Sequence, residues 1–128
     1  MDADELLKRY AAGERDFSGM NLSCLDLTGA NLSGINLSGA NLTRSYLHET
    51  DLSQADLSRT NLEFTGFRSA NLTGANLQEA NLEYASLRNA NLAGANLLNA
   101  KLTKTLSGAT FCNTIMPDGS ISNDNSLS

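Results

Sequence analysis

An apolar residue occupies every fifth position from Phe17 to Leu102, which makes 18 uninterrupted centres, 16 of them Leu and two of them Phe. A period of five matches neither the two-residue alternation of a β-strand nor the 3.6-residue turn of an α-helix. A short fixed repeat of this kind indicates stacked coils, in which each repeat buries its apolar residue against its neighbours. The repeat therefore points to a solenoid.

The residues around each centre are small or favour turns. The second residue before the centre is Ala in ten of the 18 repeats and Ser or Thr in four, which predicts a second inward position with little room. The intervening residue is Asn ten times and Asp four times, and both side chains bond to nearby backbone in turns. The last position holds bulky residues such as Arg44, Phe64 and Tyr84 as well as Gly. Because type II turns favour Gly or Asn at that position, we predict mostly type I turns.

The pattern Ala-(Asp/Asn)-Leu-Xaa-Xaa resembles that of the pentapeptide repeat family. The resemblance implies an all-β solenoid, specifically a right-handed quadrilateral β-helix in which each pentad forms one side. Four pentads would make one coil, so 18 pentads would make about 4.5 coils. The phrase Ala-Thr-Phe-Cys-Asn-Thr, with Met-Pro-Asp-Gly close by, is similar to the ends of cyanobacterial members of the family.

The sequence divides the single domain into four segments. Residues 1–14 should form a short N-terminal capping helix, with Asp2 or Asp4 as its N-cap and Gly13 at its end. Residues 15–105 should form the β-helix. The five-residue spacing slips after Leu102, so we expect residues 106–121 to form a distorted last coil and C-terminal cap, with a turn at residues 117–119. Residues 122–128 should be a disordered tail.

Charge and cysteine content limit the function classes. The net charge is −5, but from Arg15 to Lys104 eight acids face seven bases, so we expect no nucleic-acid partner. Cys24 and Cys112 should lie too far apart for a disulfide, which suits a reducing compartment. The chain shows no leader and no run of 18 apolar residues. We therefore expect a cytoplasmic protein, without a membrane partner and monomeric.

One side of the predicted coil departs from the repeat. Stacking at a twenty-residue interval predicts one contiguous basic-aromatic patch, formed by Arg44, Tyr46, His48, Phe64, Arg68, Tyr84 and Arg88. Lys104 would continue its corner column. Arg and aromatic residues are enriched at protein contacts, so the patch is a candidate partner-binding surface. Stacked aromatics also stabilise adjacent coils by packing alone, with Glu63 and Glu83 as ion-pair partners of the bases. The sequence is compatible with both interpretations.

The sequence favours a non-enzymatic scaffold for protein–protein interaction, with regulation of a partner as one such role, and with no catalytic residues and no cofactor. No nucleophile has a paired base, and His48, the only histidine, has no partners at metal-ligand spacing. The alternative is a DNA mimic that binds a topoisomerase such as gyrase, as some longer acidic members of the family do. The near-neutral coil body disfavours mimicry, because Arg68 and Arg88 interrupt any acidic stripe.

Overall fold

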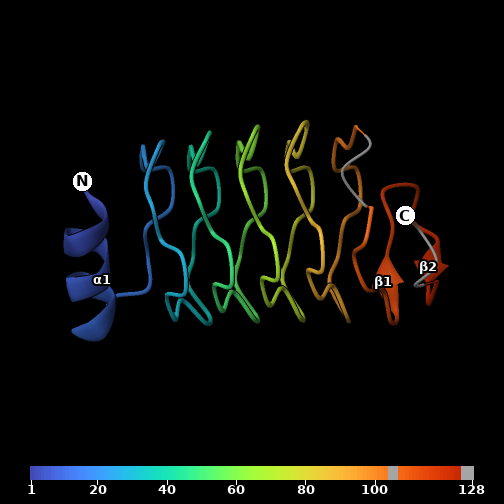
Figure 1. Ribbon diagram of the computed structural model, residues 1–128, viewed down its shortest axis with the longest axis horizontal. Coiled ribbons are helices and arrows are strands. Elements are labelled where there is room, and N and C mark those ends of the chain that lie inside the picture. Colours follow the sequence, from blue (N-terminus) through green and yellow to red (C-terminus); the bar gives the residue numbers. More distant parts are fainter. Residues whose placement is uncertain (104–106, 125–128) are drawn as a thin grey trace.

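The protein is a stack of coils with a helix at one end and a hairpin at the other (Figure 1). The structure, a computed structural model, describes residues 1–103 and 107–124. Helix α1 spans Ala3–Ala11, and strands β1 (Thr114–Ile115) and β2 (Ile121–Ser122) pair antiparallel at the far end. Parallel bridges join residues twenty apart, from Asp16↔Asn36 to Asn81↔Lys101. Each complete coil therefore contains four pentads, one on each of its four sides.

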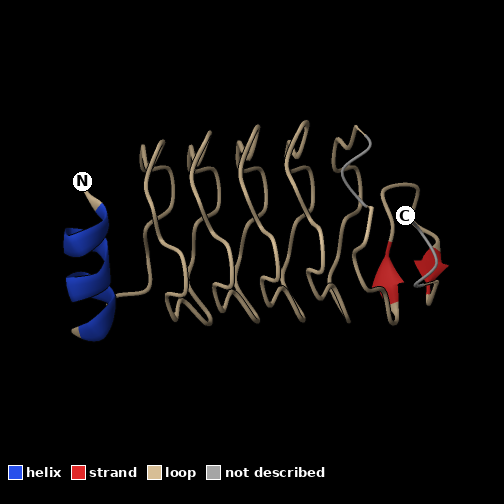
Figure 2. Ribbon diagram, viewed as in Figure 1, coloured by secondary structure: helices blue, strands red, loops and turns tan. Residues whose placement is uncertain are grey.

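The coils are held by isolated bridges rather than by extended strands, which refines the all-β expectation. On each side a single residue, the one before the centre, pairs with the coils before and after it, and a turn follows at once. Figure 2 accordingly shows the coils as loops and turns, with β1 and β2 as the strands.

From here on each pentad is counted from the Asn or Asp before the centre, so that the centre is its second residue. Every backbone N–H of a regular pentad has an acceptor, as the pentad Asn41–Ser45 illustrates. The first, second and fourth N–H groups donate to backbone carbonyls of adjacent coils, at 2.9, 2.9 and 3.0 Å. The fifth donates to the carbonyl of the second residue at 3.1 Å and closes the turn. The third donates to Oδ1 of the Asn41 side chain at 3.0 Å. The Asn or Asp before each centre therefore caps the third N–H, which fits the full pairing of backbone donors in folded proteins.

The prediction of type I turns is wrong. The fourth residue of every pentad from Gly19 to Asn99 has a positive φ, including Arg44 (61°), Phe64 (58°) and Tyr84 (61°). A positive φ at the third residue of a β-turn is characteristic of type II. The cause is the axial pairing, because this peptide must lie along the stack to bond to the next coil, as Arg44 N–H does to a carbonyl. That bond, worth about 0.5–1.5 kcal/mol, offsets part of the cost of the left-handed conformation, which is about 1–2 kcal/mol.

The interior is filled by the side chains at and before the centres. Leu and Phe at the centres from Phe17 to Leu97 are fully buried, and a column of buried Ala packs beside them. The buried hydroxyls of Ser45, Thr50 and Thr65 donate to carbonyls of the coil before, Ser45 Oγ to the Leu22 carbonyl at 2.8 Å, whereas that of Thr60 donates to the Leu57 carbonyl of its own coil. Leu6 of α1 is buried against the first coil, and Tyr10 Oη donates to the Ser33 carbonyl at 2.6 Å. Helix α1 thus covers the open end of the first coil.

The last coil is one residue shorter than the others. Its bridges, Asn91↔Thr110 and Asn96↔Ile115, join residues nineteen apart, in agreement with the slip in the repeat after Leu102. Residues 117–119 form the expected turn between β1 and β2, with Gly119 at φ 88°. The disordered tail was expected from Ser122, but Ser122 belongs to β2. Residues 125–128 lie outside the described residues.

Candidate functional site

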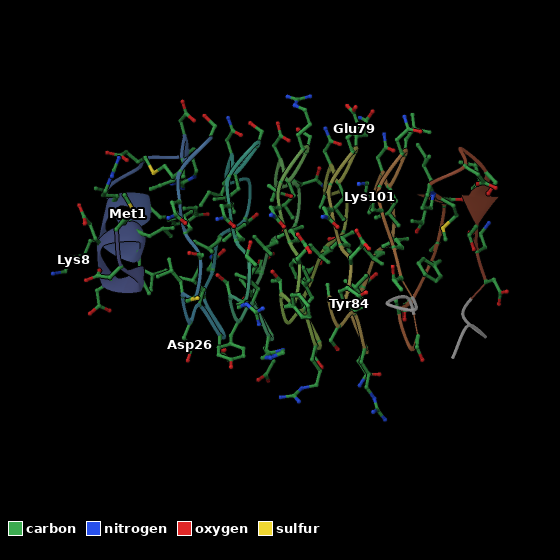
Figure 3. The ribbon with its side chains drawn as sticks, turned by 90° about the horizontal axis from the view of Figure 1, so that it is seen from above. Met1, Lys8, Asp26, Glu79, Tyr84 and Lys101 are labelled. Atoms are coloured by element: carbon green, nitrogen blue, oxygen red, sulfur yellow. The ribbon has the colours of Figure 1, made fainter. Side chains whose placement is uncertain are left out.

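The third side of the coil, counted from the pentad of Phe17, is where the repeat changes. Bridges run in one line from Asp26 to Tyr46, from Tyr46 to Gly66 and from Gly66 to Ser86. All four residues precede a centre. On the other three sides this position is Asn or Asp in every pentad up to that of Asn96, whereas the third side keeps it only at Asp26 and has Tyr46, Gly66 and Ser86 after it. The basic-aromatic patch predicted above consists of this side and the corner that precedes it. Figure 3 shows Asp26 at the opposite edge of the stack from Glu79.

The corner carries a column of stacked side chains. The Arg44 guanidinium lies over the Phe64 ring, 4.6 Å from its centroid. The Phe64 and Tyr84 rings stack at 5.0 Å with an interplanar angle of 14°. Both rings remain exposed, by 44% and 59%, so their outer edges face solvent. Lys104, the expected continuation of this column, lies outside the described residues.

A second column runs along the side itself and centres on His48. The His48 ring stacks with Tyr46 at 5.7 Å and 28°. It also lies over Gly66, where an added Cβ would fall 2.2 Å from Cε1 of the imidazole. Nδ1 of His48 accepts the backbone N–H of Arg68 at 3.0 Å. His48 therefore replaces, from the adjacent coil, the acceptor that an Asn would provide at position 66.

Two other N–H groups on this side are uncapped. Every third-position N–H from Ser18 to Leu98 is accepted by the Asn or Asp two residues before it, except those of the three pentads centred on Leu47, Phe67 and Leu87. The N–H of Arg68 is capped by His48. The N–H groups of His48 and Arg88 have no acceptor among the described residues.

The arginines of the patch have no acidic partners. Within the part of the chain that the structure describes, Arg9 and Glu14 form an ion pair at 2.7 Å, whereas Arg44, Arg68 and Arg88 form none. The expectation that Glu63 and Glu83 pair with these bases is therefore wrong. Both glutamates belong to the second side, and the aromatic corner column lies between that side and the third.

The acid at the start of the third side is ionised at neutral pH. The hydroxyl of Thr28, together with its backbone N–H, holds the pKa of Asp26 below its usual value, and His48 acts in the same direction. Asp26 caps its own turn by accepting the Thr28 N–H at 3.1 Å. The first coil thus keeps the regular arrangement that the next three coils lose.

Other groups that could carry chemistry are dispersed. Both thiols, Cys24 and Cys112, are free and exposed. Among residues 1–103 and 107–124, no three His, Cys, Asp or Glu side chains are grouped so that they could hold a metal ion. The same residues include no helix of the length and apolar character needed to cross a bilayer.

The sequence grouped the seven patch residues, and the structure places Arg44, Phe64 and Tyr84 in the corner column and the other four on the adjoining third side. The sequence did not reveal that His48 caps the Arg68 N–H or that the N–H groups of His48 and Arg88 are uncapped. The available signal was the loss of Asn at three successive third-side pentads, with Gly66 directly beneath His48.

Comparison with known proteins identifies the repeat. Pentapeptide repeats, in eight copies, match residues 16–39, 26–63 and 70–106. No protein of curated function matches the chain significantly in sequence. Rfr23, a pentapeptide repeat protein from the cyanobacterium Cyanothece 51142, is 38% identical with a TM-score of 0.69, over 73% of this chain and 62% of that one. The chain thus spans less than two thirds of the length of Rfr23.

Two further solved structures are similar. The pentapeptide repeat protein alr5209 from Nostoc PCC 7120 is 36% identical with a TM-score of 0.63, over 79% of each chain. A pentapeptide repeat protein from the Arabidopsis thaliana thylakoid lumen is 31% identical with a TM-score of 0.52, over 70% of this chain and 67% of that one. A lumenal relative leaves the cytoplasmic location a prediction. The matched repeats, the four-sided coils and these similarities together show that the chain belongs to the pentapeptide repeat family, whose members fold as right-handed quadrilateral β-helices.

Proposed function

We propose that the chain is a non-enzymatic scaffold that presents the basic-aromatic patch to a partner protein. The observation that carries the proposal is the set of three arginines without ion-pair partners beside exposed aromatic rings on one surface. Exposed aromatic and Arg side chains supply most of the binding energy at many protein interfaces. The patch concentrates both on one corner and the adjoining third side of the same coils.

Packing alone accounts for only part of the patch. The stack of Phe64 on Tyr84 stabilises adjacent coils, as stacked aromatics do elsewhere. It does not explain why Arg68 and Arg88 follow the centres on the same side, or why Ser86 replaces the capping Asn.

The scaffold also suits recognition because the patch is already ordered. From Arg44 to Arg68 its backbone is hydrogen-bonded to the coils before and after it, Ser86 N–H donates to the coil before, and the rings are held by stacking. A surface that does not reorganise loses little conformational entropy on binding. The Leu- and Ala-filled interior supports a binding role over catalysis. The unpaired arginines disfavour mimicry of DNA, whose backbone is uniformly anionic.

Affinity capture from a cyanobacterial lysate tests the proposal with three folded versions of the full chain. The first is wild type, and the second replaces Arg44, Phe64, Arg68, Tyr84 and Arg88 by Ala. The matched control replaces Arg59, Glu79 and Asn99 by Ala; these residues occupy the same turn position, also with positive φ, at another corner. We expect a partner retained by wild type and by the control but lost from the patch variant. Equal capture by all three would refute the proposal.

A further inference from the structure

The uncapped N–H of Arg88 is the most specific binding feature of the patch. In the regular pentads, an Oδ1 lies 3.0–3.3 Å from the third N–H and accepts it. At the pentad of Leu87 the preceding residue is Ser86, which is exposed and makes no bond to this N–H. The turn therefore offers one outward backbone donor where the rest of the coil places a side-chain oxygen.

The second uncapped N–H, that of His48, is a poorer site. Its pentad places Tyr46 at the capping position, and the Tyr46 ring stacks on the imidazole of His48. The third donor on this side, the N–H of Arg68, is already occupied by Nδ1 of His48. The Arg88 donor alone has no acceptor among the described residues and a small, exposed residue, Ser86, at the capping position.

The charges around this donor select the ligand. Arg68 and Arg88 follow the centres of adjacent coils on the same side, so their backbones lie about 4.8 Å apart along the stack. Both are exposed, and neither has an acidic partner among the described residues. The corner residues of the same two coils, Ser69 and Asn89, are uncharged. Glu49, one coil earlier, donates its N–H to the Arg68 carbonyl at 2.9 Å, but its carboxylate forms no ion pair with Arg68 in the described part of the chain. A carboxylate is the complementary group, since it can accept one backbone N–H and two guanidinium donors together.

We infer that the third side binds an acidic segment of a partner protein, one carboxylate of which takes the place of the missing Asn and accepts the Arg88 N–H between the Arg68 and Arg88 guanidinium groups. This inference rests on the proposed scaffold function and names the chemistry of its partner. The exposed rings of Phe64 and Tyr84 on the adjoining corner provide apolar contacts for a peptide. The coil body is close to neutral, which favours a short acidic peptide over an extended polyanion such as nucleic acid.

Ser86→Asn is a sharp test because it should remove the site without harming the fold. It restores the capping residue of the repeat, so Asn Oδ1 would accept the Arg88 N–H internally, while Arg68 and Arg88 remain. General electrostatic attraction is thus unchanged. The matched control is Asn91→Ser on the fourth side, which uncaps the Ala93 N–H in a place without arginines.

The probe is an acetylated hexaglutamate peptide, compared with hexaglutamine, in amide NMR titrations of the labelled full chain at physiological salt. We expect hexaglutamate, but not hexaglutamine, to shift the Arg88 amide proton downfield in a saturable way. Ser86→Asn should weaken this binding by about tenfold or more, since a hydrogen bond to a charged group is lost. Asn91→Ser should bind as wild type does, with no shift at Ala93.

Equal binding by Ser86→Asn and wild type would overturn the inference, as would a response of Arg88 to inorganic phosphate but not to hexaglutamate. The capture experiment separates this failure from that of the proposed function. A partner lost from the five-alanine variant but retained by Ser86→Asn would keep the patch as an interface and overturn the carboxylate site. A partner lost from both variants supports the carboxylate site.

Discussion

Substitution of Gly66 tests the link between the third side and its histidine cap. An Ala Cβ at this position would lie 2.2 Å from Cε1 and 2.5 Å from Nε2 of His48. Real Cβ atoms do not approach other atoms so closely, so the imidazole must move away. The displaced ring would lose its bond to the Arg68 N–H and its stack on Tyr46.

The expected cost follows from those two contacts. A hydrogen bond of this kind contributes about 0.5–1.5 kcal/mol, and an aromatic stack contributes about 0.5–1.5 kcal/mol. Replacing Gly by Ala restricts the unfolded chain and returns about 0.4–1 kcal/mol where the backbone is compatible. Gly66 is not among the residues with positive φ, so its backbone accepts Ala. We therefore expect Gly66→Ala to lower the free energy of unfolding by about 1 kcal/mol.

Two companion variants sharpen the result. Gly66→Asn also displaces His48 but brings its own Oδ1 to the Arg68 N–H, so it should be more stable than Gly66→Ala. Adding His48→Ala to Gly66→Asn should cost almost nothing more, because the histidine has already lost its contacts. Urea unfolding measures the stabilities, and the chemical shift of the Arg68 amide reports the cap. If Gly66→Ala matched wild type in both, the assignment of His48 as the cap would be refuted.

Three further predictions concern the scaffold. Glu79→Gly should raise the free energy of unfolding by about 0.5–1 kcal/mol because Glu79 has φ 60°, which Gly adopts without strain, and a thermal melt showing destabilisation would contradict type II turns. Leu62→Ala, which empties part of the fully buried core, should cost about 2–5 kcal/mol in urea unfolding; a cost under 1 kcal/mol would argue against a close-packed interior. The hydroxyl and N–H of Ser18 hold the pKa of Asp16 below its usual value, so its carboxylate stabilises the fold above about pH 4, and that stability is lost as pH falls through the lowered pKa. Asp16→Asn keeps the Oδ1 acceptor without titrating, so its acid unfolding should lack this component, and identical acid profiles would contradict the assignment.

The repeat made most of the fold predictable. The five-residue period identifies the centres that the structure buries, and the shortened spacing after Leu102 marks the coil whose bridges change from twenty to nineteen residues. Turn type was not predictable from residue preference. Side chains such as those of Glu79 and Tyr84 disfavour positive φ, but each turn must match the axial hydrogen bonds of its neighbours. A cooperative ladder outweighs the preference of any single residue.

The candidate site was only partly predictable. The residues that depart from the repeat could be grouped because the twenty-residue interval puts them in columns. Their contacts depend on side-chain conformation, which spacing does not determine. The Arg44 guanidinium stacks on Phe64 instead of pairing with Glu63 or Glu83. The imidazole of His48 turns towards Gly66 and the Arg68 N–H. The uncapped Arg88 N–H follows from a full account of backbone donors, which needs the structure.

The central claim is that the third side leaves free some backbone donors whose counterparts on the other sides are capped by Asn or Asp. Amide hydrogen exchange at the residue after each centre tests this claim most directly. We expect the amides of His48 and Arg88 to exchange fastest among these positions, and the Arg68 amide to be protected in wild type but not in His48→Ala. Capped amides such as that of Thr43 should be protected throughout. Protection of Arg88 equal to that of Thr43 would contradict the account, because it would show that this donor is already bonded within the fold.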